Sequence, residues 1–245
     1  NFALRDEDKW IISRVNDAAE YVTKALERYD LALAGQRVYE LIWNEYCDWY
    51  IELVKKRLWG DDEEDKKVVR FVLVMVPKNM LEMLHPFMPF ITEEIWSFLP
   101  HSICERENNP ECFLIKAQWP EYSENRHFAA EEERLELAME AIRAIRNIRA
   151  EADAAPSKKL RAVIFAEGEK MEAIQGGERY IKDLANITDI EFVTDKSGVP
   201  EEVMSAVING VEIFIPLDDL VDFNAEFDRL TKEKKKLEGE VARVK

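Results

Sequence analysis

Residues 84–96 read LHPFMPFITEEIW, and this stretch decides the fold of the chain around it. Two prolines stiffen an apolar turn there, because proline fixes its own backbone angle and donates no amide hydrogen bond. We expect Phe87, Met88 and Phe90 to be buried in the turn. We expect Thr92 to cap the helix that follows, since its hydroxyl can accept from free backbone amides. The stretch therefore predicts two helices joined by a rigid apolar corner.

Helical periodicity extends on both sides of this corner. Apolar residues recur three and four positions apart over residues 8–29, 31–58, 68–84 and 129–150, which places them on one face of each helix. Pro77 is expected to kink the helix over residues 68–84. The acidic run 61–65 is expected to be a solvated turn. These patterns predict a mainly α fold, with a helical bundle over residues 1–154.

The period changes after residue 154. Residues 160–166 and 189–194 have strand patterns, and residues 169–185 have a helical one. Residues 206–216 are typical of a hairpin that turns at Asn209-Gly210. We therefore expect a small α+β domain over residues 155–221.

The last part of the chain, residues 222–245, has a heptad seam. Its members are Phe223, Phe227, Leu230, Lys234, Leu237, Val241 and Val244. This spacing predicts the start of a C-terminal coiled-coil helix. An isolated helix of this length is marginal in water, so we expect either weak self-association through the seam or fraying.

Composition limits the class of protein. The 245 residues are 47% hydrophobic, which favours folded domains over disorder. Three cysteines without a framework spacing favour free thiols in a reduced, cytoplasmic protein. No apolar run is long enough to span a membrane. Neither a phosphate-binding glycine loop nor a nucleophile motif occurs, so we expect no catalytic residue and no cofactor.

The net charge of −16 argues against a nucleic-acid partner, but its distribution does not. Residues 141–161 hold six basic side chains against two acidic ones: Arg143, Arg146, Arg149, Lys158, Lys159 and Arg161. The three arginines step three positions apart along one helix and could follow a phosphate backbone. Alternatively, they interact with the helix C-terminal dipole. The other three basic residues either extend the stripe or belong to a solvated loop.

Two further groups have competing interpretations. Trp43, Tyr46, Trp49 and Tyr50 could stack on unpaired bases, but their helical spacing favours core packing. His101, Cys104 and Cys112 match no paired zinc-ligand pattern, so we predict no metal site.

Several stretches resemble a known family. Residues 84–96 resemble the signature of the helical anticodon-binding domain in class I synthetases for valine, isoleucine and leucine. The sequences WIISRVN (10–16), WNEYCDWYIELVKKRL (43–58), RNIRAEADAAPSKK (146–159) and INGVEIFIPLDDLVDF (208–223) are most similar to the valyl-tRNA synthetase family. The resemblance covers nearly the whole chain and implies a C-terminal part of such an enzyme.

The resemblance implies a role in binding rather than chemistry. It implies that the chain binds valine-specific tRNA and positions it for a catalytic domain of the same enzyme, which uses ATP. No HIGH-like or KMSKS-like motif is present, so the chain alone is expected to be inactive. Lys232, Lys235 and Lys236, with Lys234, resemble the family's basic arm against tRNA, although a solvated coiled-coil face is an equal alternative. The rival functions are the same module of an isoleucyl enzyme and a helical scaffold that binds no RNA.

Overall fold

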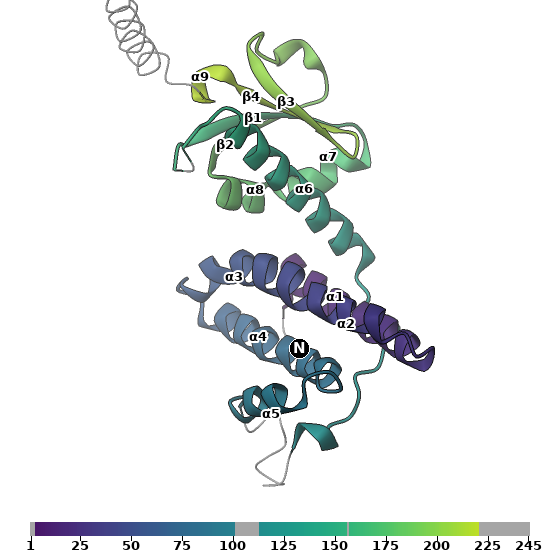
Figure 1. Ribbon diagram of the computed structural model, residues 1–245. Helices are drawn as coiled ribbons and strands as arrows, with labels where there is room; N and C mark the ends of the chain where they lie inside the picture. The colour runs from purple at the N-terminus through teal and green to yellow at the C-terminus, as the bar shows by residue number, and fades with distance from the viewer. Residues whose placement is uncertain (1–2, 101–112, 156, 221–245) are drawn as a thin grey trace, which may run out of the picture. The chain divides into compact units, whose positions relative to one another are not determined.

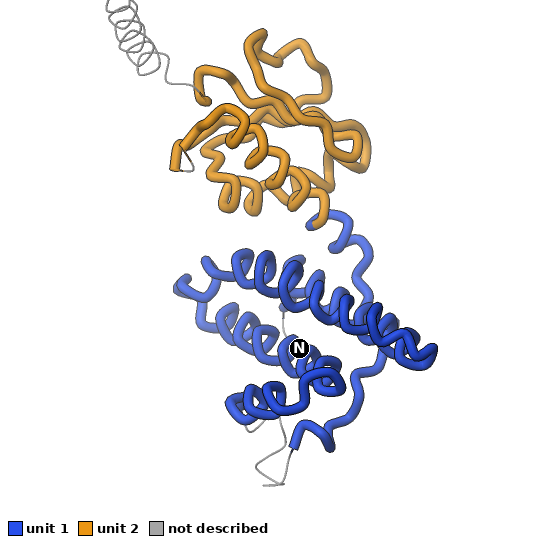
Figure 2. The backbone as a smooth tube through the Cα atoms, viewed as in Figure 1, with its two compact units in different colours: residues 1–135 blue, residues 136–245 orange. Residues whose placement is uncertain are grey.

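The computed structural model describes residues 3–100, 113–155 and 157–220 of the protein. The chain forms two compact units, Asn1–Leu135 and Glu136–Lys245 (Figures 1 and 2). No helix among the described residues has both the length and the apolar character needed to cross a membrane. The coiled coil expected over residues 222–245 lies outside the described residues.

The first unit is helical, and α1 is its central helix. Its elements are α1 (Asp6–Glu27), α2 (Leu31–Glu40), η1 (Leu41–Tyr50), α3 (Ile51–Leu58), α4 (Glu63–Leu84), α5 (Pro89–Ser97), η2 (Leu114–Lys116), η3 (Glu124–Arg126) and the start of α6 (Ala129–Glu151). Helix α1 packs against α2, η1 and α4. Ile11, Val15, Ala18 and Val22 are buried on its inner side. The periodicity of this segment is therefore confirmed.

The helical segment expected over residues 31–58 exists, but its middle is not α-helical. Element η1 is a π-helix, in which the backbone bonds join residues five apart. This winding brings Leu41, Tyr46 and Tyr50, spaced five and four, toward the same side. The rings of Tyr46 and Tyr50 stack with their centroids 6.0 Å apart, and the Tyr46 hydroxyl donates to the Leu73 carbonyl at 2.9 Å. A search for spacings of three and four could not predict this change of winding.

A buried ionic cluster joins α1, α3 and α4. Arg57 on α3 donates from Nη1 to Glu7 Oε1 at 2.9 Å and to Asp8 Oδ2 at 2.8 Å. Its Nη2 binds Asp65 Oδ1 on α4 at 2.6 Å. The Tyr50 hydroxyl donates to the other oxygen of Asp8 at 2.9 Å. Burial raises the pKa of Asp8, although Arg57 opposes the change. The cluster ties three helices together in the core.

The acidic run 61–65 is exposed over residues 61–64, as its composition predicts, but its last three residues form the first turn of α4 rather than a loop. Asp62 caps α4, since its Oδ1 accepts from the amides of Glu64 and Asp65 at 3.0 and 3.1 Å. Asp65 lies in the first turn of α4, and its side chain is 10% exposed in the pair with Arg57. The acidic composition of the run is evident from the sequence, but its pairing of Asp65 with the buried Arg57 is not.

The corner at residues 84–96 differs from expectation in two respects. Helix α5 begins at Pro89, with Met88 as the N-cap, because a proline in the first turn lacks the amide that a cap would satisfy. Thr92 therefore lies inside α5, where its hydroxyl donates to the Met88 carbonyl at 2.8 Å. Met88 and Phe90 were expected to be buried, yet they are 51% and 91% exposed. Phe87 is half-buried.

The second unit is a small α+β structure, as the sequence predicts. Its strands are β1 (Leu160–Phe165), β2 (Ile187–Val193), β3 (Val203–Ile208) and β4 (Val211–Pro216), in the sheet order β2-β1-β4-β3. Strand β1 pairs in parallel with β2 through a crossover of α7 (Glu169–Gly176) and α8 (Glu178–Ala185). It pairs antiparallel with β4. A short helix α9 (Leu217–Leu220) follows β4, and a 3-10 turn η4 (Lys196–Gly198) precedes β3.

Two local details of this unit follow from glycines. The hairpin between β3 and β4 turns at Asn209 and Gly210, whose φ angles are 42° and 81°, so the predicted turn is confirmed. The helix expected over residues 169–185 divides at Gly177. A Cβ atom there would lie 2.6 Å from the Cβ of Ala138, so glycine permits close packing on α6.

The compact units divide inside α6. Residues 129–135 belong to the first unit and residues 136–151 to the second. The later turns of α6 contact α8, since Arg146 and Arg149 donate to the carbonyls of Leu184 and Ala185. The sequence pattern changes only where strand structure begins, near residue 155. The predicted domain boundary at residue 154 follows this change of pattern, and it stays a prediction.

Candidate nucleic-acid interface

The predicted basic stripe lies on α6 and the start of β1, and its members have different environments. Arg149 is 6% exposed. It donates to the carbonyls of Ala155 at 3.1 Å, Lys158 at 2.5 Å and Ala185 at 2.8 Å. Burial lowers the pKa of Arg149. Its guanidinium therefore joins the end of α6 to the segment before β1 and to the end of α8.

Arg146 and Arg143 lie on the exposed side of α6. Arg146 donates from Nε and Nη2 to the Leu184 carbonyl at 3.3 and 2.8 Å, so it also bridges α6 and α8. Its side chain nevertheless remains exposed to solvent. Arg143, one turn earlier, is exposed on the same helix.

The joint between α6 and β1 carries the other three basic residues. Lys159 is exposed and Lys158 is half-buried. Arg161 forms a bidentate pair with Asp219 of α9, with Nε–Oδ2 at 2.9 Å and Nη2–Oδ1 at 3.0 Å. The hydrogen bond to Asp219 raises the pKa of Arg161. An RNA phosphate would have to compete with this carboxylate.

The four aromatic residues of η1 divide between core and surface. Trp49 and Tyr50 are buried and Tyr46 is half-buried, which agrees with the core-packing interpretation. Trp43 is 53% exposed and lies beside the exposed Tyr39, with ring centroids 6.3 Å apart and tilted by 47°. Of the four predicted residues, Trp43 alone is exposed. Together with Tyr39 of α2 it presents aromatic rings to solvent.

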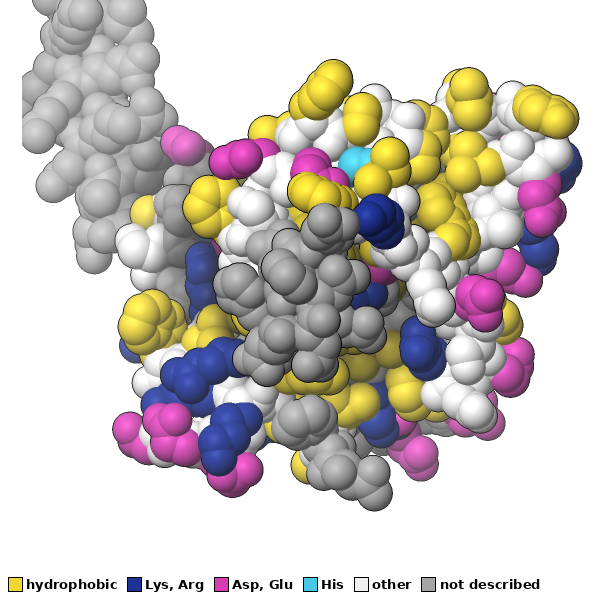
Figure 3. Space-filling model, turned by 90° about the horizontal axis from the view of Figure 1, so that it is seen from below, with side chains coloured by type: hydrophobic (Ala, Val, Ile, Leu, Met, Phe, Trp, Pro, Cys, Tyr) yellow, Lys and Arg dark blue, Asp and Glu magenta, His cyan; other side chains and the backbone are white. Residues whose placement is uncertain are grey.

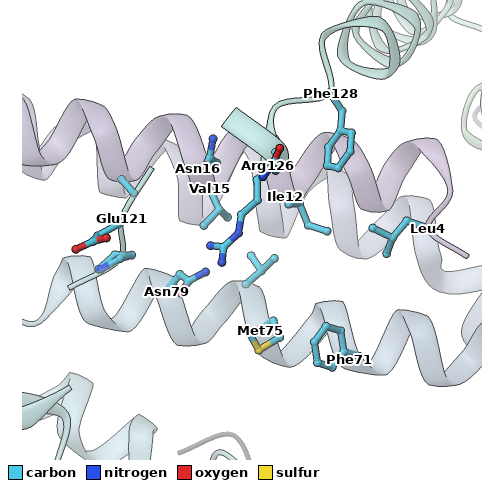
Figure 4. Close-up of a pocket in the computed structure, with 14 residues that line it drawn as sticks. Leu4, Ile12, Val15, Asn16, Phe71, Met75, Asn79, Glu121, Arg126 and Phe128 are labelled. Carbon is cyan, nitrogen blue, oxygen red and sulfur yellow. The ribbon is translucent and has the colours of Figure 1, made fainter. Parts of the chain in front are cut away.

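A cavity of about 350 Å³ lies between α1 and α4 and is also lined by the segment that contains η3. Its wall is apolar and includes Ile12, Val15 and Met75. Figure 4 shows the Arg126 side chain extending into the cavity toward Asn79. An apolar wall with amide and guanidinium groups among its lining residues suits a planar heteroaromatic ring.

The cavity also holds an unsatisfied donor. Asn16 Oδ1 accepts from the Ser123 amide at 2.8 Å, whereas its buried Nδ2 has no hydrogen-bond partner among the described residues. Sequence reasoning missed this cavity, because its residues come from segments more than a hundred positions apart. No local pattern of three or four residues could indicate it.

A family model described as the anticodon-binding domain of tRNA ligase matches residues 8–164, which is more than half of the chain. The chain belongs to this family. The resemblance that its sequence motifs indicate is thereby confirmed.

Curated relatives of this anticodon-binding domain are valine–tRNA ligases. Those of Clostridium acetobutylicum and Clostridium perfringens are 42% and 43% identical to it over 237 residues. That of Oceanobacillus iheyensis is 39% identical over 238 residues. Each alignment covers 97% of this chain and 26% of the relative. The chain thus spans about a quarter of the length of the relatives that it matches.

One group of side chains in the anticodon-binding domain has the residue types of a metal site. The ligand atoms of Asp17, His127 and Glu132 lie within 4.8 Å of one another in the described part of the chain. His127 Nδ1 is 3.5 Å from Asp17 Oδ1 and 3.6 Å from Glu132 Oε1, so a protonated imidazole would form ion pairs with both. These ion pairs would link α1, through Asp17, to the loop before α6 and to α6 itself.

The remaining predicted residues lie outside the described ones. They are the tail lysines Lys232, Lys234, Lys235 and Lys236, and the three residues at which no zinc site is predicted, His101, Cys104 and Cys112. The absence of a metal and of a cofactor stays a prediction. Cys47 is a free thiol.

Proposed function

We propose that this chain binds the anticodon stem and loop of a valine-specific tRNA. In that role it would position the tRNA for a catalytic domain that belongs to the same ligase, uses ATP and is not spanned by this sequence. The observation that carries the proposal is the family match over residues 8–164, together with relatives that are valine–tRNA ligases. The proposal includes a cytoplasmic location and weak self-association through residues 222–245.

The second unit would contact phosphates through the exposed side chains of the basic stripe. Arg143 and Lys159 are the best candidates, because both are exposed, whereas Arg161 is held by the Asp219 carboxylate. Arg146 and Lys158 are secondary candidates. Arg149 is excluded from direct contact by its burial and its three carbonyl acceptors.

The first unit would receive unstacked bases. Loops of single-stranded RNA are recognised by stacking and by hydrogen bonds to splayed bases. The cavity between α1 and α4 offers an apolar wall, the free Nδ2 of Asn16 and the Asn79 amide. The exposed Trp43 and Tyr39 rings offer a stacking surface.

The test is tRNA binding as a function of salt, with labelled transcripts of a valine and an isoleucine tRNA. Binding to the valine transcript at low salt should weaken steeply between roughly 50 and 200 mM salt, because counterions are released from the neutralised phosphates. The paired charge reversals Arg143→Glu and Lys159→Glu should lower the slope by about two. Lys196→Glu, in the same unit but outside the stripe, is the matched control and should leave the slope unchanged.

A second variant separates base contacts from phosphate contacts. Asn79→Ala should weaken binding by about 1–3 kcal/mol at every salt concentration and leave the slope unchanged. No binding at low salt would favour the helical scaffold over an RNA-binding domain. Equal affinity for both transcripts would refute the valine specificity while leaving tRNA binding intact.

A further inference from the structure

Helix α5 has a covered side and a neighbouring apolar side that is exposed. Its inner side carries Thr92 and Trp96, which are at most 1% exposed. Trp96 packs in one cluster with Leu81 of α4 and Leu114 of η2. This cluster accounts for the whole inner side, so the packing of the first unit explains only half of the apolar character of α5.

The outer side carries four large apolar side chains spaced three, four and three: Met88, Ile91, Ile95 and Phe98. We call these residues the α5 face. All four are exposed, Phe98 by 79%, and Phe90 next to them is exposed by 91%. Phe113 and Ile115 in and beside η2, which packs on α5, are also exposed. Figure 3, which views the molecule from below, shows hydrophobic side chains at the surface between charged ones.

Such an arrangement indicates a covered surface. Large contiguous apolar patches on soluble monomers mark interaction sites. The corner motif at residues 84–96 supplies most of these side chains, so the feature that most clearly marks the family in this sequence is largely a surface feature.

The chemistry of the face limits its occupant. Helix α5 contains no lysine or arginine and has Glu93 and Glu94, so it repels a polyanion such as RNA. A second copy of the chain carries the same net charge of −16, and the acidic Glu93 and Glu94 of α5 add to the repulsion at this face, so a second copy is a poorer occupant here. The chain spans 26% of the length of its relatives, so most of such a ligase polypeptide is available as an apolar partner.

We propose that the α5 face docks against the part of the same ligase polypeptide that this chain does not span. The occupant is an apolar surface with basic residues at its rim, complementary to the exposed Glu94. The inference rests on the chain being one part of a ligase, but not on tRNA binding. It is therefore tested without RNA.

The experiment is carbene footprinting, which labels solvent-exposed side chains irrespective of type. The chain is labelled alone, at low and high concentration, and again when joined to the rest of its ligase. Labelling of Phe90, Ile95 and Phe98 should fall at least about fivefold in the whole ligase, because burial removes the side chains from water. Trp59, which is 85% exposed at the end of α3, is the internal reference for an exposed aromatic ring.

Substitutions test the same contact energetically. When the chain and the remainder of the ligase are mixed as separate polypeptides, Phe90→Ser and Phe98→Ser should each weaken association about tenfold, which corresponds to about 1.4 kcal/mol. Trp59→Ser should change it less than twofold. If the remainder does not fold alone, the footprint still decides the question.

Three outcomes would overturn the proposal. Equal labelling of the α5 face in the chain and in the whole ligase would show that the face stays open. Protection in the chain alone that grows with concentration would identify a second copy as the occupant. Protection in the chain alone at every concentration would show that the chain covers the face by itself.

Discussion

Replacing Arg57 with methionine is expected to destabilise the first unit strongly. Arg57 is the cation common to Glu7, Asp8 and Asp65, and the side chains of Glu7 and Asp8 are only 1% and 0% exposed. Removing one partner of a buried ion pair costs about 3–5 kcal/mol, because the remaining charge is buried without compensation. Small domains are stable by only about 5–15 kcal/mol. The Arg57→Met variant should therefore lose a large fraction of its stability.

The assay is thermal and urea unfolding followed by circular dichroism. At about 2–4 °C for each kcal/mol, the melting temperature should fall by roughly 6–20 °C. Arg134→Met is the matched control, since Arg134 pairs with Asp6 while both side chains remain about one third exposed. The loss of that pair should cost less than about 1 kcal/mol.

The deficit should also depend on pH. Burial already raises the pKa of Asp8 above its ordinary 3.8, and the loss of Arg57 removes the main effect that lowers it. A carboxyl with a raised folded pKa binds protons more tightly when folded, so the free energy of unfolding rises as the pH falls through that pKa. The difference between the variant and the parent should therefore shrink as the pH is lowered from neutral. A loss no larger than that of Arg134→Met would refute the reasoning, because it would mean that water or other groups compensate the carboxylates.

Three further predictions concern the second unit and the chemistry. Arg149→Met should destabilise the second unit by about 1.5–3 kcal/mol, measured by urea unfolding, because hydrogen bonds from a charged group to buried carbonyls are lost; an unchanged midpoint would return Arg149 to the list of RNA contacts. Gly177→Ala should cost about 1–3 kcal/mol by overpacking against Ala138, and Ala138→Gly in the same chain should restore most of it; additive effects in the double variant would refute the contact. The chain alone should not activate valine, since it has no ATP-handling motif of the family, and ATP–pyrophosphate exchange above background would contradict this.

Much of the fold could be predicted from periodicity alone. The buried stripe of α1, the hairpin at Asn209-Gly210 and the strands β1 and β2 follow from local patterns that one or two turns of chain determine. The exceptions depend on contacts between distant segments. The π-helical winding of η1 and the division of the helix at Gly177 are set by what packs against them, so no window of local sequence contains the cause.

The burial of individual side chains was also difficult to predict from local sequence. Met88 and Phe90 are apolar, and an apolar residue in a rigid corner is ordinarily buried within its own domain. Sequence cannot say whether the burying surface belongs to the same domain or to another part of the polypeptide. The role of Arg149 was equally hidden, since its acceptors at Lys158 and Ala185 come from segments that only the folded chain brings to α6.

The uses of the arginines bear directly on how such an acidic chain could hold tRNA. Of the six basic residues in the stripe, Arg149 is committed to carbonyls inside the protein and Arg161 to Asp219. Few cations then remain for phosphates, and each phosphate contact contributes to affinity mainly by releasing counterions. We therefore expect the chain alone to bind tRNA weakly at physiological salt. In a whole ligase, a second tRNA contact on the same polypeptide would raise the effective concentration of this domain at the anticodon, so even a few phosphate contacts and one base cavity would suffice.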